Sequence, residues 1–330
     1  MTSPHRVGVA GTGSYVPERV VPNSWFEDVV DTSDEWIVQR TGFRGRRWVA
    51  KGEATASMST VAARRALEQA KIDPAEVDLI VLATLTPDHL LPSCSSRVQH
   101  DLGATRAGIM DLNSACTGFM TATATARAFI ASGQARTVVA IGAETLSAFL
   151  DLEDRASCIL FGDGAGATVF TRLEDAGGRG ELLETTLGAA GSGYDFIHMQ
   201  GGGSLMPPTV ESVNARRHFI GVRGREVYKF AVTRMSSIIE ELLAGHDREE
   251  LGLIVPHQVN MRIIESALQR LDIPMDKCMI NIDKYGNTSA ATVPIAFDEA
   301  AREGRLEPGK LVVTCAFGAG LTWGGSLMRW

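Results

Sequence analysis

Three strand-then-helix units in the first half of the chain recur in the second half at nearly constant spacing. Three pairs of apolar runs match, and each pair is separated by a similar number of residues. Their central residues are Ile80 and Ile254 (174 residues apart), Ile109 and Met279 (170 apart), and Val139 and Val313 (174 apart). Such repetition indicates two copies of one α/β unit, although any alternating chain offers some matches by chance. If the duplication is real, the crevice between the copies is the expected active site, at the carboxyl ends of paired strands.

Short apolar runs alternate with longer amphipathic segments, which is typical of an α/β fold with mixed, largely parallel sheets. Strands are predicted over residues 7–10, 79–85, 109–112, 137–141, 167–170, 253–255, 279–282 and 311–316. Helices are predicted over 57–71, 93–102, 117–132, 226–243, 261–271 and 288–303. The glycine-rich stretch 188–208 is expected to be a connection or a surface hairpin. We divide the chain into two halves, 1–175 and 176–330.

Charge and cysteine content narrow the classes of function. The 330 residues carry 32 Lys and Arg against 39 Asp and Glu, a net charge of −7, so a nucleic-acid partner is not expected. No apolar run approaches the roughly 20 residues of a membrane span, and no apolar signal segment precedes the first strand. Five cysteines without a CxxC or metal-ligand spacing predict reduced thiols, no metal and a cytoplasmic location.

Two glycine-rich stretches resemble nucleotide-binding loops but lack the required pattern. Gly11 and Gly13 follow an apolar strand, yet Val16 stands where a dinucleotide fingerprint needs its third glycine. The stretch 162–166 leads into a predicted strand rather than a helix. Both are interpreted as tight turns, and no cofactor is expected.

Cys116 is the candidate nucleophile. It lies where a predicted strand ends and a helix of small residues begins. The positive end of the peptide dipoles at a helix N-terminus favours a thiolate. The other cysteines, at positions 94, 158, 278 and 315, are interpreted as inert buried thiols.

Two polar residues occupy comparable junctions in the second half. His257 follows an apolar strand, and Asn287 stands at the N-cap position of the second small-residue helix. An offset of 170 residues puts Asn287 nearly at the place that Cys116 holds in the first half. Such a histidine can be structural and such an asparagine only a cap. Three polar groups at three junctions of a duplicated fold nevertheless make Cys116, His257 and Asn287 a candidate site.

This set of side chains suits acyl transfer. A thiolate accepts an acyl group from a thioester at little thermodynamic cost, because one thioester becomes another. Neutral histidine and asparagine can donate hydrogen bonds to charge developing on a carbonyl oxygen. Hydrolysis would also need a positioned water and an oriented general base. We therefore expect acyl transfer with an enolate intermediate.

Eight motifs, taken in order, resemble those of β-ketoacyl-acyl carrier protein synthase III, a condensing enzyme of the thiolase fold. They are 32–37 (TSDEWI), 40–42 (RTG), 115–119 (ACTGF), 161–167 (FGDGAGA), 224–229 (GREVYK), 256–258 (PHQ), 285–289 (YGNTS) and 317–324 (FGAGLTWG). The resemblance extends over residues 7–330 and implies two duplicated α/β halves packed as alternating helix and sheet layers. Asparagine at position 287 matches the initiating type, since the elongating synthases carry a second histidine there.

The resemblance implies a reaction in two stages. An acyl group passes from acyl-CoA to Cys116, and malonyl-acyl carrier protein then loses CO2 so that its enolate attacks the acyl-enzyme. His257 and Asn287 match the pair that holds the malonyl thioester oxygen. The backbone N–H groups of Cys116 and Ala319 match the oxyanion hole. Acyl-CoA is a substrate rather than a cofactor, and the chain is expected to form a homodimer.

Further matches concern substrate binding. The CoA and pantetheine contacts implied by the resemblance are Thr32, Trp36, Arg40, Arg155, Gly224, Tyr228 and Asn260. Within this set, Trp36 and Arg155 match the residues that sandwich the adenine, a stacking and cation–π arrangement. Thr32 matches an adenine hydrogen-bond partner and Arg40 a phosphate contact.

A local basic patch is implied for the acidic acyl carrier protein. Lys229 and Arg262 match this patch, which would meet the carrier despite the negative net charge. Arg44, Arg46 and Arg47 are either additions to it or side chains of a solvated loop.

Position 91 is leucine in this chain (Leu91), whereas family members that prefer acetyl-CoA often have phenylalanine there. In those members the phenylalanine of one subunit closes the acyl pocket of the other. Phe317 is expected to line the same pocket. The smaller leucine predicts room for a longer or branched primer.

Four other functions stay open. A phosphorylating aldehyde dehydrogenase would need the dinucleotide fingerprint, and a Cys-His-Asn hydrolase would release free acid. A secondary-metabolite acyltransferase or ketosynthase of the same fold would keep Cys116 and use another acceptor. A catalytically inactive subunit that supports a partner synthase would not need Cys116, His257 and Asn287, so their presence argues against this function.

Overall fold

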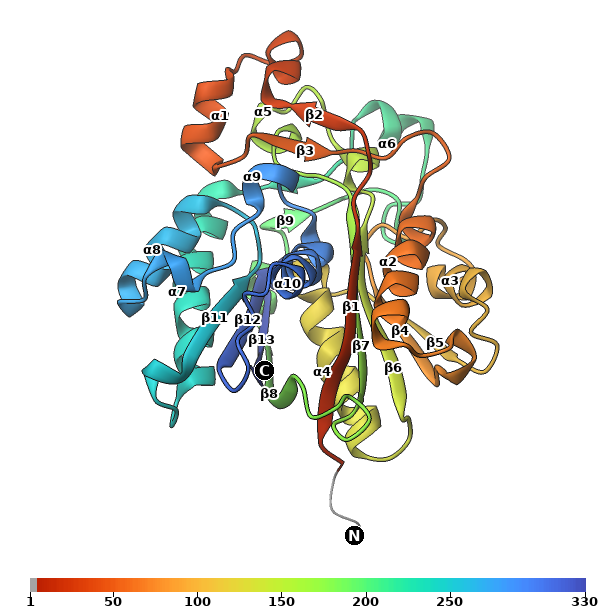
Figure 1. Cartoon of the computed structure of the whole chain (residues 1–330). Coiled ribbons are helices and arrows are strands. Elements are labelled where there is room, and N and C mark those ends of the chain that lie inside the picture. The colour runs from red at the N-terminus through yellow and green to blue at the C-terminus, as the bar shows by residue number, and fades with distance from the viewer. Residues whose placement is uncertain (1–4) are drawn as a thin grey trace.

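Two β-sheets, one from each half of the chain, form the frame of the molecule (Figure 1). The computed structural model describes residues 5–330. The first sheet runs in the order β1 (Val7–Tyr15), β7 (Gly164–Arg172), β6 (Thr137–Glu144), β4 (Leu79–Ala83) and β5 (Gly108–Leu112). The second runs β8 (Glu181–Ala189), β13 (Thr322–Arg329), β12 (Leu311–Gly318) and β11 (Leu251–Pro256). Two small ribbons pair β2 (Val20–Pro22) with β3 (Gly45–Arg47) and β9 (Ile197–His198) with β10 (Gly221–Val222).

The two sheets repeat the same strand order, direction and register. In the first, Ile80 of β4 pairs with Val139 of β6, and in the second Ile254 of β11 pairs with Val313 of β12, both in parallel. The fifth position of the second sheet is reduced to a single parallel bridge between Ile254 and Cys278. The duplication predicted from the 174-residue offsets is therefore confirmed.

Ten helices are described between residues 5 and 330, and they build the remaining layers. They are α1 (Asp34–Thr41), α2 (Thr55–Ala70), α3 (Cys94–Leu102), α4 (Gly118–Ala131), α5 (Arg155–Cys158), α6 (Val210–Asn214), α7 (Gly224–Leu243), α8 (Met261–Leu271), α9 (Ile282–Tyr285) and α10 (Thr292–Arg302).

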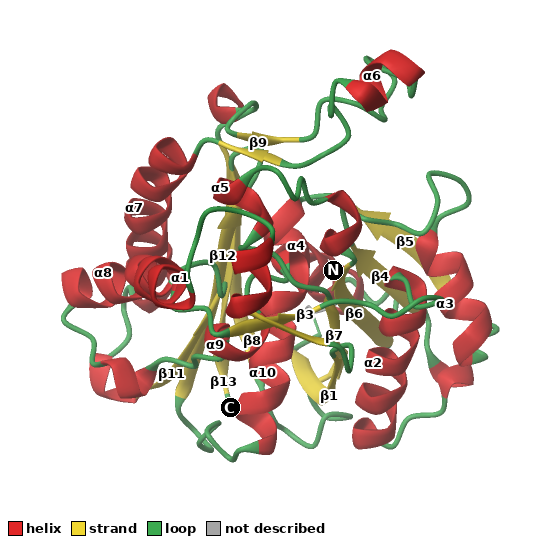
Figure 2. Ribbon diagram, turned by 90° about the horizontal axis from the view of Figure 1, so that it is seen from above, coloured by secondary structure: helices red, strands yellow, loops and turns green. Residues whose placement is uncertain are grey.

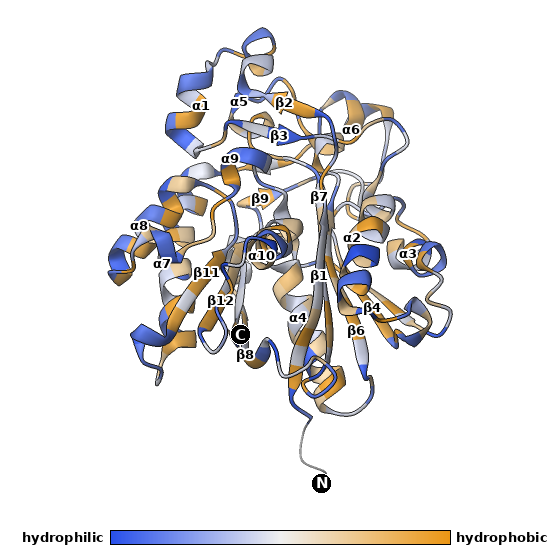
Figure 3. Cartoon of the chain, in the orientation of Figure 1, coloured by the Kyte–Doolittle hydropathy of each residue, from blue (hydrophilic) through white to orange (hydrophobic). Residues whose placement is uncertain are grey.

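Helices and sheets alternate, as the resemblance implied. Helices α4 and α10 pack between the two sheets and contact strands of both (Figure 2). Helices α2 and α3 cover the outer face of the first sheet, and α7 covers that of the second with α8 packed against it. Figure 3 shows hydrophobic colour along β4, β6, β11 and β12 and both hydrophilic and hydrophobic colour on α8. Small residues such as Gly118, Ala122 and Ala126 let α4 fit between two sheets.

Strand pairing is mixed rather than largely parallel. It is parallel among β6, β4 and β5 and between β11 and β12, and antiparallel for β1, β7, β8 and β13. The sequence analysis missed β13 because Gly324 and Gly325 interrupt its apolar pattern. A Cβ on Gly325 would lie 2.8 Å from Leu242 Cδ1, so the strand needs glycine where α7 packs closely.

The predicted strand over 279–282 is wrong. Its one ladder contact is at Cys278, and Ile282 begins the short helix α9. Four apolar residues are too few for periodicity to separate a strand from another buried segment. The stretch 188–208 is a connection that contains β9. The division at 175/176 falls between β7 and β8 and stays a prediction.

Within residues 5–330, no helix combines the length and the apolar character that crossing a bilayer requires.

Close backbone contact between the halves generates a first prediction. A Cβ on Gly142 of β6 would overlap the carbonyl oxygen of Ala290 in the second half. We expect Gly142→Ala to lower the free energy of unfolding by about 1–3 kcal/mol through overpacking. Urea unfolding measures this loss. Gly203→Ala is the control, because its Cβ would meet nothing within 4 Å; equal stability of the two variants would contradict the packing account.

Candidate active site

The strand–helix junctions predicted to carry the chemistry converge on one cavity between the halves. It has a volume of about 470 Å³. Cys116 comes from the 3-10 helix η3 (Ala115–Thr117), which leads into α4, and His257 directly follows β11. Asn287 lies just before the 3-10 helix η8 (Ser289–Ala291), which leads into α10. Phe317 and Ala319, at the end of β12, line the same space.

Cys116 is partly exposed, whereas the other four cysteines are fully buried, as expected for inert thiols. Burial raises the pKa of the Cys116 thiol to about 12, while a hydrogen bond with Ser289 acts in the opposite direction. Burial therefore opposes the thiolate that the helix N-terminus favours. Any transfer to this sulfur must begin by removing its proton.

The His257 ring is neutral at physiological pH. It is 1% exposed, and burial lowers its pKa to about 3. Its Nδ1 lies 2.6 Å from the Thr292 hydroxyl, and its edge packs against Phe317 with 5.7 Å between ring centroids. Nε2 is buried and has no hydrogen-bond partner among the described residues. That atom is available to a ligand in the cavity.

Asn287 also keeps one polar group for a ligand. Its Oδ1 accepts a hydrogen bond from the Ser289 backbone N–H at 2.8 Å. The side-chain NH2 is then the group left to donate into the cavity, beside His257.

The pseudo-equivalence of Cys116 and Asn287 expected from the sequence is wrong by three residues. The helix pairs η3–α4 and η8–α10 repeat at an offset of 174, not 170. Ala115 and Ser289 are the true counterparts and share an unusual positive φ of 45° and 49°. The counterpart of Cys116 is therefore Ala290. The shorter offset came from the 109 and 279 segments, and the second of these forms no strand.

Gly318 allows β12 to approach the nucleophile closely. A Cβ there would lie 2.7 Å from Cys116 Cβ and 3.2 Å from its sulfur, so a side chain at this position is excluded. The next residue, Ala319, lines the cavity. This contact brings a backbone turn from the second half beside the sulfur.

Most of the residues implied for CoA and pantetheine line the same cavity. They are Trp36, Arg40, Arg155, Gly224, Tyr228 and Asn260. Thr32 is not among the lining residues, but its hydroxyl is buried without a partner among the described residues.

The Trp36–Arg155 pair is closed in this structure. The Arg155 guanidinium lies 5.0 Å from the centroid of the Trp36 ring, and Arg155 donates to the Asp31 carbonyl at 2.7 Å. A base stacked between them would need about 7 Å, twice a van der Waals separation. A ring stacked between the two side chains would therefore require Arg155 to move.

Lys229 and Arg262 are exposed, on α7 and α8 beside residues that line the cavity. Arg44 is also exposed. The suggestion that Arg46 adds to this patch is wrong, because its side chain is fully buried and donates to Asn23 Oδ1 at 2.9 Å and the Ile159 carbonyl at 2.7 Å. Arg47 is half-buried and bonds to backbone carbonyls.

Leu91 does not line the cavity of its own chain. It is 87% exposed in a loop where Leu90 is 89% exposed. Phe317 does line the cavity.

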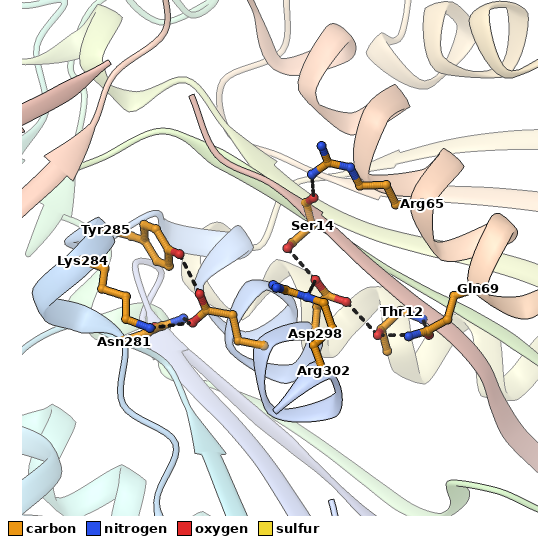
Figure 4. Close-up of polar contacts among 10 residues, drawn as sticks. Thr12, Ser14, Arg65, Gln69, Asn281, Lys284, Tyr285, Asp298 and Arg302 are labelled. Atoms are coloured by element: carbon orange, nitrogen blue, oxygen red, sulfur yellow. Dashed lines mark hydrogen bonds and ion pairs between the residues drawn. The ribbon is translucent and has the colours of Figure 1, made fainter. Parts of the chain in front are cut away.

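A second, polar cavity of about 680 Å³ lies on the other side of α10. Asp298 accepts hydrogen bonds there from Thr12 at 2.8 Å and Ser14 at 2.6 Å, and Glu299 accepts from Tyr285 (Figure 4). These buried carboxylates accept hydrogen bonds from neighbouring side chains, and the bonds connect α10 to β1 and α9. Among residues 5–330, no group of three His, Cys, Asp or Glu side chains is arranged to hold a metal ion.

Three residues at or near the site, Ser289, Thr292 and Glu144, were not predicted from the sequence. Glu144 ends β6, all of whose residues are buried, and is itself 0% exposed. A carboxylate at the end of a mostly apolar run, residues 137–144, was the available signal, since an acid is rarely buried without a function or a partner.

Comparisons with known proteins agree with this geometry. Family models described as 3-oxoacyl-[acyl-carrier-protein (ACP)] synthase III match residues 110–191 and, for the C-terminal part, 243–330. A β-ketoacyl-[acyl-carrier-protein] synthase III from Caldanaerobacter subterraneus is 47% identical over 98% of this chain and 97% of its own.

Two solved structures extend the likeness to the fold. The crystal structure of 3-oxoacyl-[acyl-carrier-protein] synthase III from Aquifex aeolicus is 44% identical, with a TM-score of 0.90 over 98% of this chain and 100% of that one. The priming β-ketosynthase of the R1128 polyketide pathway is 34% identical, with a TM-score of 0.91 over 100% and 98%. With identity at this level over almost the whole length, the chain belongs to the β-ketoacyl-[acyl-carrier-protein] synthase III family.

Proposed function

We propose that this chain catalyses the initiating condensation of fatty-acid synthesis. Acyl-CoA acylates Cys116, and decarboxylative Claisen condensation with malonyl-acyl carrier protein then gives 3-ketoacyl-acyl carrier protein, CO2 and CoA. The main support is that a thiol, a neutral imidazole and a carboxamide line one apolar cavity supplied by both halves. An apolar lining limits the contact of an enolate with water.

In the first stage, the Cys116 sulfur attacks the thioester carbonyl. The backbone N–H groups of Cys116 and Ala319 receive the developing oxyanion, and the absence of a side chain on Gly318 lets the second of these approach. CoA enters past Trp36 and Arg155, with Thr32, Arg40, Gly224, Tyr228 and Asn260 along its path.

In the second stage, His257 and Asn287 hold the thioester oxygen of the malonyl group. Both must act as donors, so His257 needs its proton on Nε2. The Thr292 hydroxyl donates to the Ser289 carbonyl at 3.0 Å and lies 2.6 Å from Nδ1. Its single proton supplies the required tautomer when it turns from that carbonyl to the closer Nδ1. Thr292 is therefore a positioning residue for His257.

The carrier protein and a second copy of the chain are the proposed partners. Lys229 and Arg262 would receive the acidic carrier beside the cavity mouth. In a homodimer, exposed Leu91 would close the acyl pocket of the partner subunit, next to Phe317. A cytoplasmic location is proposed with these partners.

Priming of a polyketide pathway is the second candidate, favoured by the 34% identity to the R1128 priming β-ketosynthase. It shares the acylation of Cys116. The two candidates differ in the carrier protein that accepts the product.

Separate variants should divide the two stages. We expect Cys116→Ala to lose acyl transfer completely and still decarboxylate malonyl-acyl carrier protein, because His257 and Asn287 remain. His257→Ala should lose decarboxylation by about 10²-fold or more, since a donor to the developing charge is gone. Intact-protein mass spectrometry and CO2 release measure the two steps. The reverse pattern would overturn these roles.

Thr292→Val should slow decarboxylation about tenfold while Cys116 still becomes acylated. Loss of one hydrogen bond that fixes the tautomer costs about 1.4 kcal/mol, which is tenfold in rate. CO2 release under single-turnover conditions is the measurement. Thr288→Val is the matched control, since that buried hydroxyl has no partner among the described residues. Equal rates in both variants would remove Thr292 from the mechanism.

Leu91→Phe should shift acylation toward acetyl-CoA and away from isobutyryl- and octanoyl-CoA, because a larger ring fills the space left for extra carbons. The acyl-enzyme masses formed from an equimolar mixture report the preference. Exclusive acetylation of the unaltered protein would contradict the wider pocket.

A further inference from the structure

Glu144 is a buried carboxylate that the proposed chemistry does not use. It is 0% exposed, and no Lys, Arg or His forms an ion pair with it within the described part of the chain. Four groups donate to it: the Thr86 hydroxyl at 2.6 Å, the Leu85 N–H at 3.1 Å, the Thr84 hydroxyl at 3.2 Å and the Ser289 hydroxyl at 3.1 Å. Burying a carboxylate without a positively charged partner costs free energy even when it is hydrogen-bonded, so the presence of Glu144 here calls for an explanation.

Ser289 connects this carboxylate to the nucleophile. It lines the active-site cavity together with Cys116, its hydroxyl donates to Glu144 Oε1 at 3.1 Å, and the same hydroxyl is close enough to the sulfur to influence the pKa of the thiol. A hydroxyl has one proton and two lone pairs. It can therefore accept from the thiol while it donates to the carboxylate.

Comparison of the two duplicated halves shows that only one of the two equivalent positions carries this pair of polar side chains. In the other half, the counterpart of Ser289 is Ala115, which has the same positive φ but no hydroxyl. The counterpart of Glu144 is Gly318, since β6 and β12 align residue for residue at an offset of 174. The backbone geometry thus does not itself require either polar side chain.

Acylation needs a proton acceptor, because the resting sulfur is a thiol. His257 is a poor choice: its Nδ1 is bound to Thr292, and burial holds its pKa far below neutrality. Burial raises the pKa of Glu144 to about 7, despite the opposing hydrogen bonds. A base is most effective when its pKa lies near the working pH.

We infer that Glu144 accepts the proton of the Cys116 thiol through the Ser289 hydroxyl as the sulfur attacks the acyl thioester. This inference rests on the proposed function, in which Cys116 is acylated. The thiol proton passes to Ser289 Oγ while the Ser289 proton passes to Glu144, and the S–C bond forms. When the C–S bond to CoA breaks, the departing thiolate takes the proton back along the same path. No proton or electron is gained or lost overall.

The other groups that face Glu144 do not titrate near neutral pH. The strand end and loop at 84–86 contribute two hydroxyls and a backbone amide, and η8 contributes Ser289. Cys116, from η3, is close enough that the Glu144 charge raises the pKa of its thiol. The carboxylate charge disfavours a thiolate at Cys116, so moving the proton to Glu144 relieves that repulsion.

The test is the pH profile of acylation in Glu144→Gln and Ser289→Ala. Each protein is mixed with acetyl- or isobutyryl-CoA, whichever labels the unaltered protein, and the acyl-enzyme is followed by intact mass in single turnovers from pH 6 to 9. The unaltered rate should rise with pH and level off above about 7. Both variants should be at least 10²-fold slower at pH 7, without the inflection, and rise tenfold per pH unit.

Alanine is compatible with the backbone at position 289, because Ala115 adopts the same conformation. Glu299→Gln is the matched control: Glu299 is also buried and accepts hydrogen bonds from Asn281 and Tyr285, but it lines the second cavity. It should keep the unaltered profile. CO2 release from malonyl-acyl carrier protein should also not change in Glu299→Gln.

Unfolding provides a readout of the same carboxyl group. Because its pKa is raised from 4.5 to about 7, the folded state holds a proton that the unfolded state has released, so stability falls as pH rises through that window. Glu144→Gln should therefore gain stability relative to the unaltered protein between pH 5 and pH 8 in urea unfolding.

The outcomes that overturn the inference are distinct. A uniform loss of rate at every pH would mean that Glu144 only supports the fold. Faster acylation in Glu144→Gln would mean that its charge merely suppresses the thiolate. An unaltered profile in both variants would exclude the relay. Failure of the unaltered protein to be acylated at all would contradict the proposed function itself, and the inference with it.

Discussion

The structure depends on the close approach of two duplicated halves through residues without side chains. Gly142 leaves room for the Ala290 carbonyl, and Gly318 leaves room for Cys116, so each half places its backbone against the start of the other's central helix. Larger residues would push the helix layer away from the sheets. The cavity, the side chains that line it and the access to the sulfur all follow from this contact, because each of them lies on the seam between the halves.

Burial, rather than ion pairing, sets the protonation states at this seam. The same apolar surroundings keep His257 neutral, keep Cys116 as a thiol and raise the pKa of Glu144 toward neutrality. A neutral imidazole is what a hydrogen-bond donor to an enolate needs, and a thiol needs an acceptor for its proton. One physical cause therefore accounts for both the second stage of the proposed reaction and the requirement for a base in the first.

Much of this could be predicted from the sequence because it depends on local pattern. The offsets of the apolar runs predicted the duplication, and polar residues at strand–helix junctions predicted the convergence of Cys116, His257 and Asn287. The predictions that were wrong, or that could not be made, concern features that depend on tertiary contacts. Arg46 was expected in a surface patch or a solvated loop, but it is buried and donates to backbone carbonyls. Burial also opposes the thiolate that the helix N-terminus favours at Cys116, and no local pattern reports that burial. Glu144 acquires its surroundings from segments 60 and 145 residues away in sequence, at Thr84 and Ser289, and no local pattern encodes that meeting.

The central claim is that one particular sulfur carries the acyl group. Peptide mapping of the protein after a brief reaction with isobutyryl-CoA or acetyl-CoA tests it directly, with CoA release measured in the same sample. The account predicts one acyl group per chain, on the peptide that contains Cys116, matched by one released CoA, with the four buried cysteines unlabelled. Acylation at another cysteine, or CoA release without a bound acyl group, would contradict it.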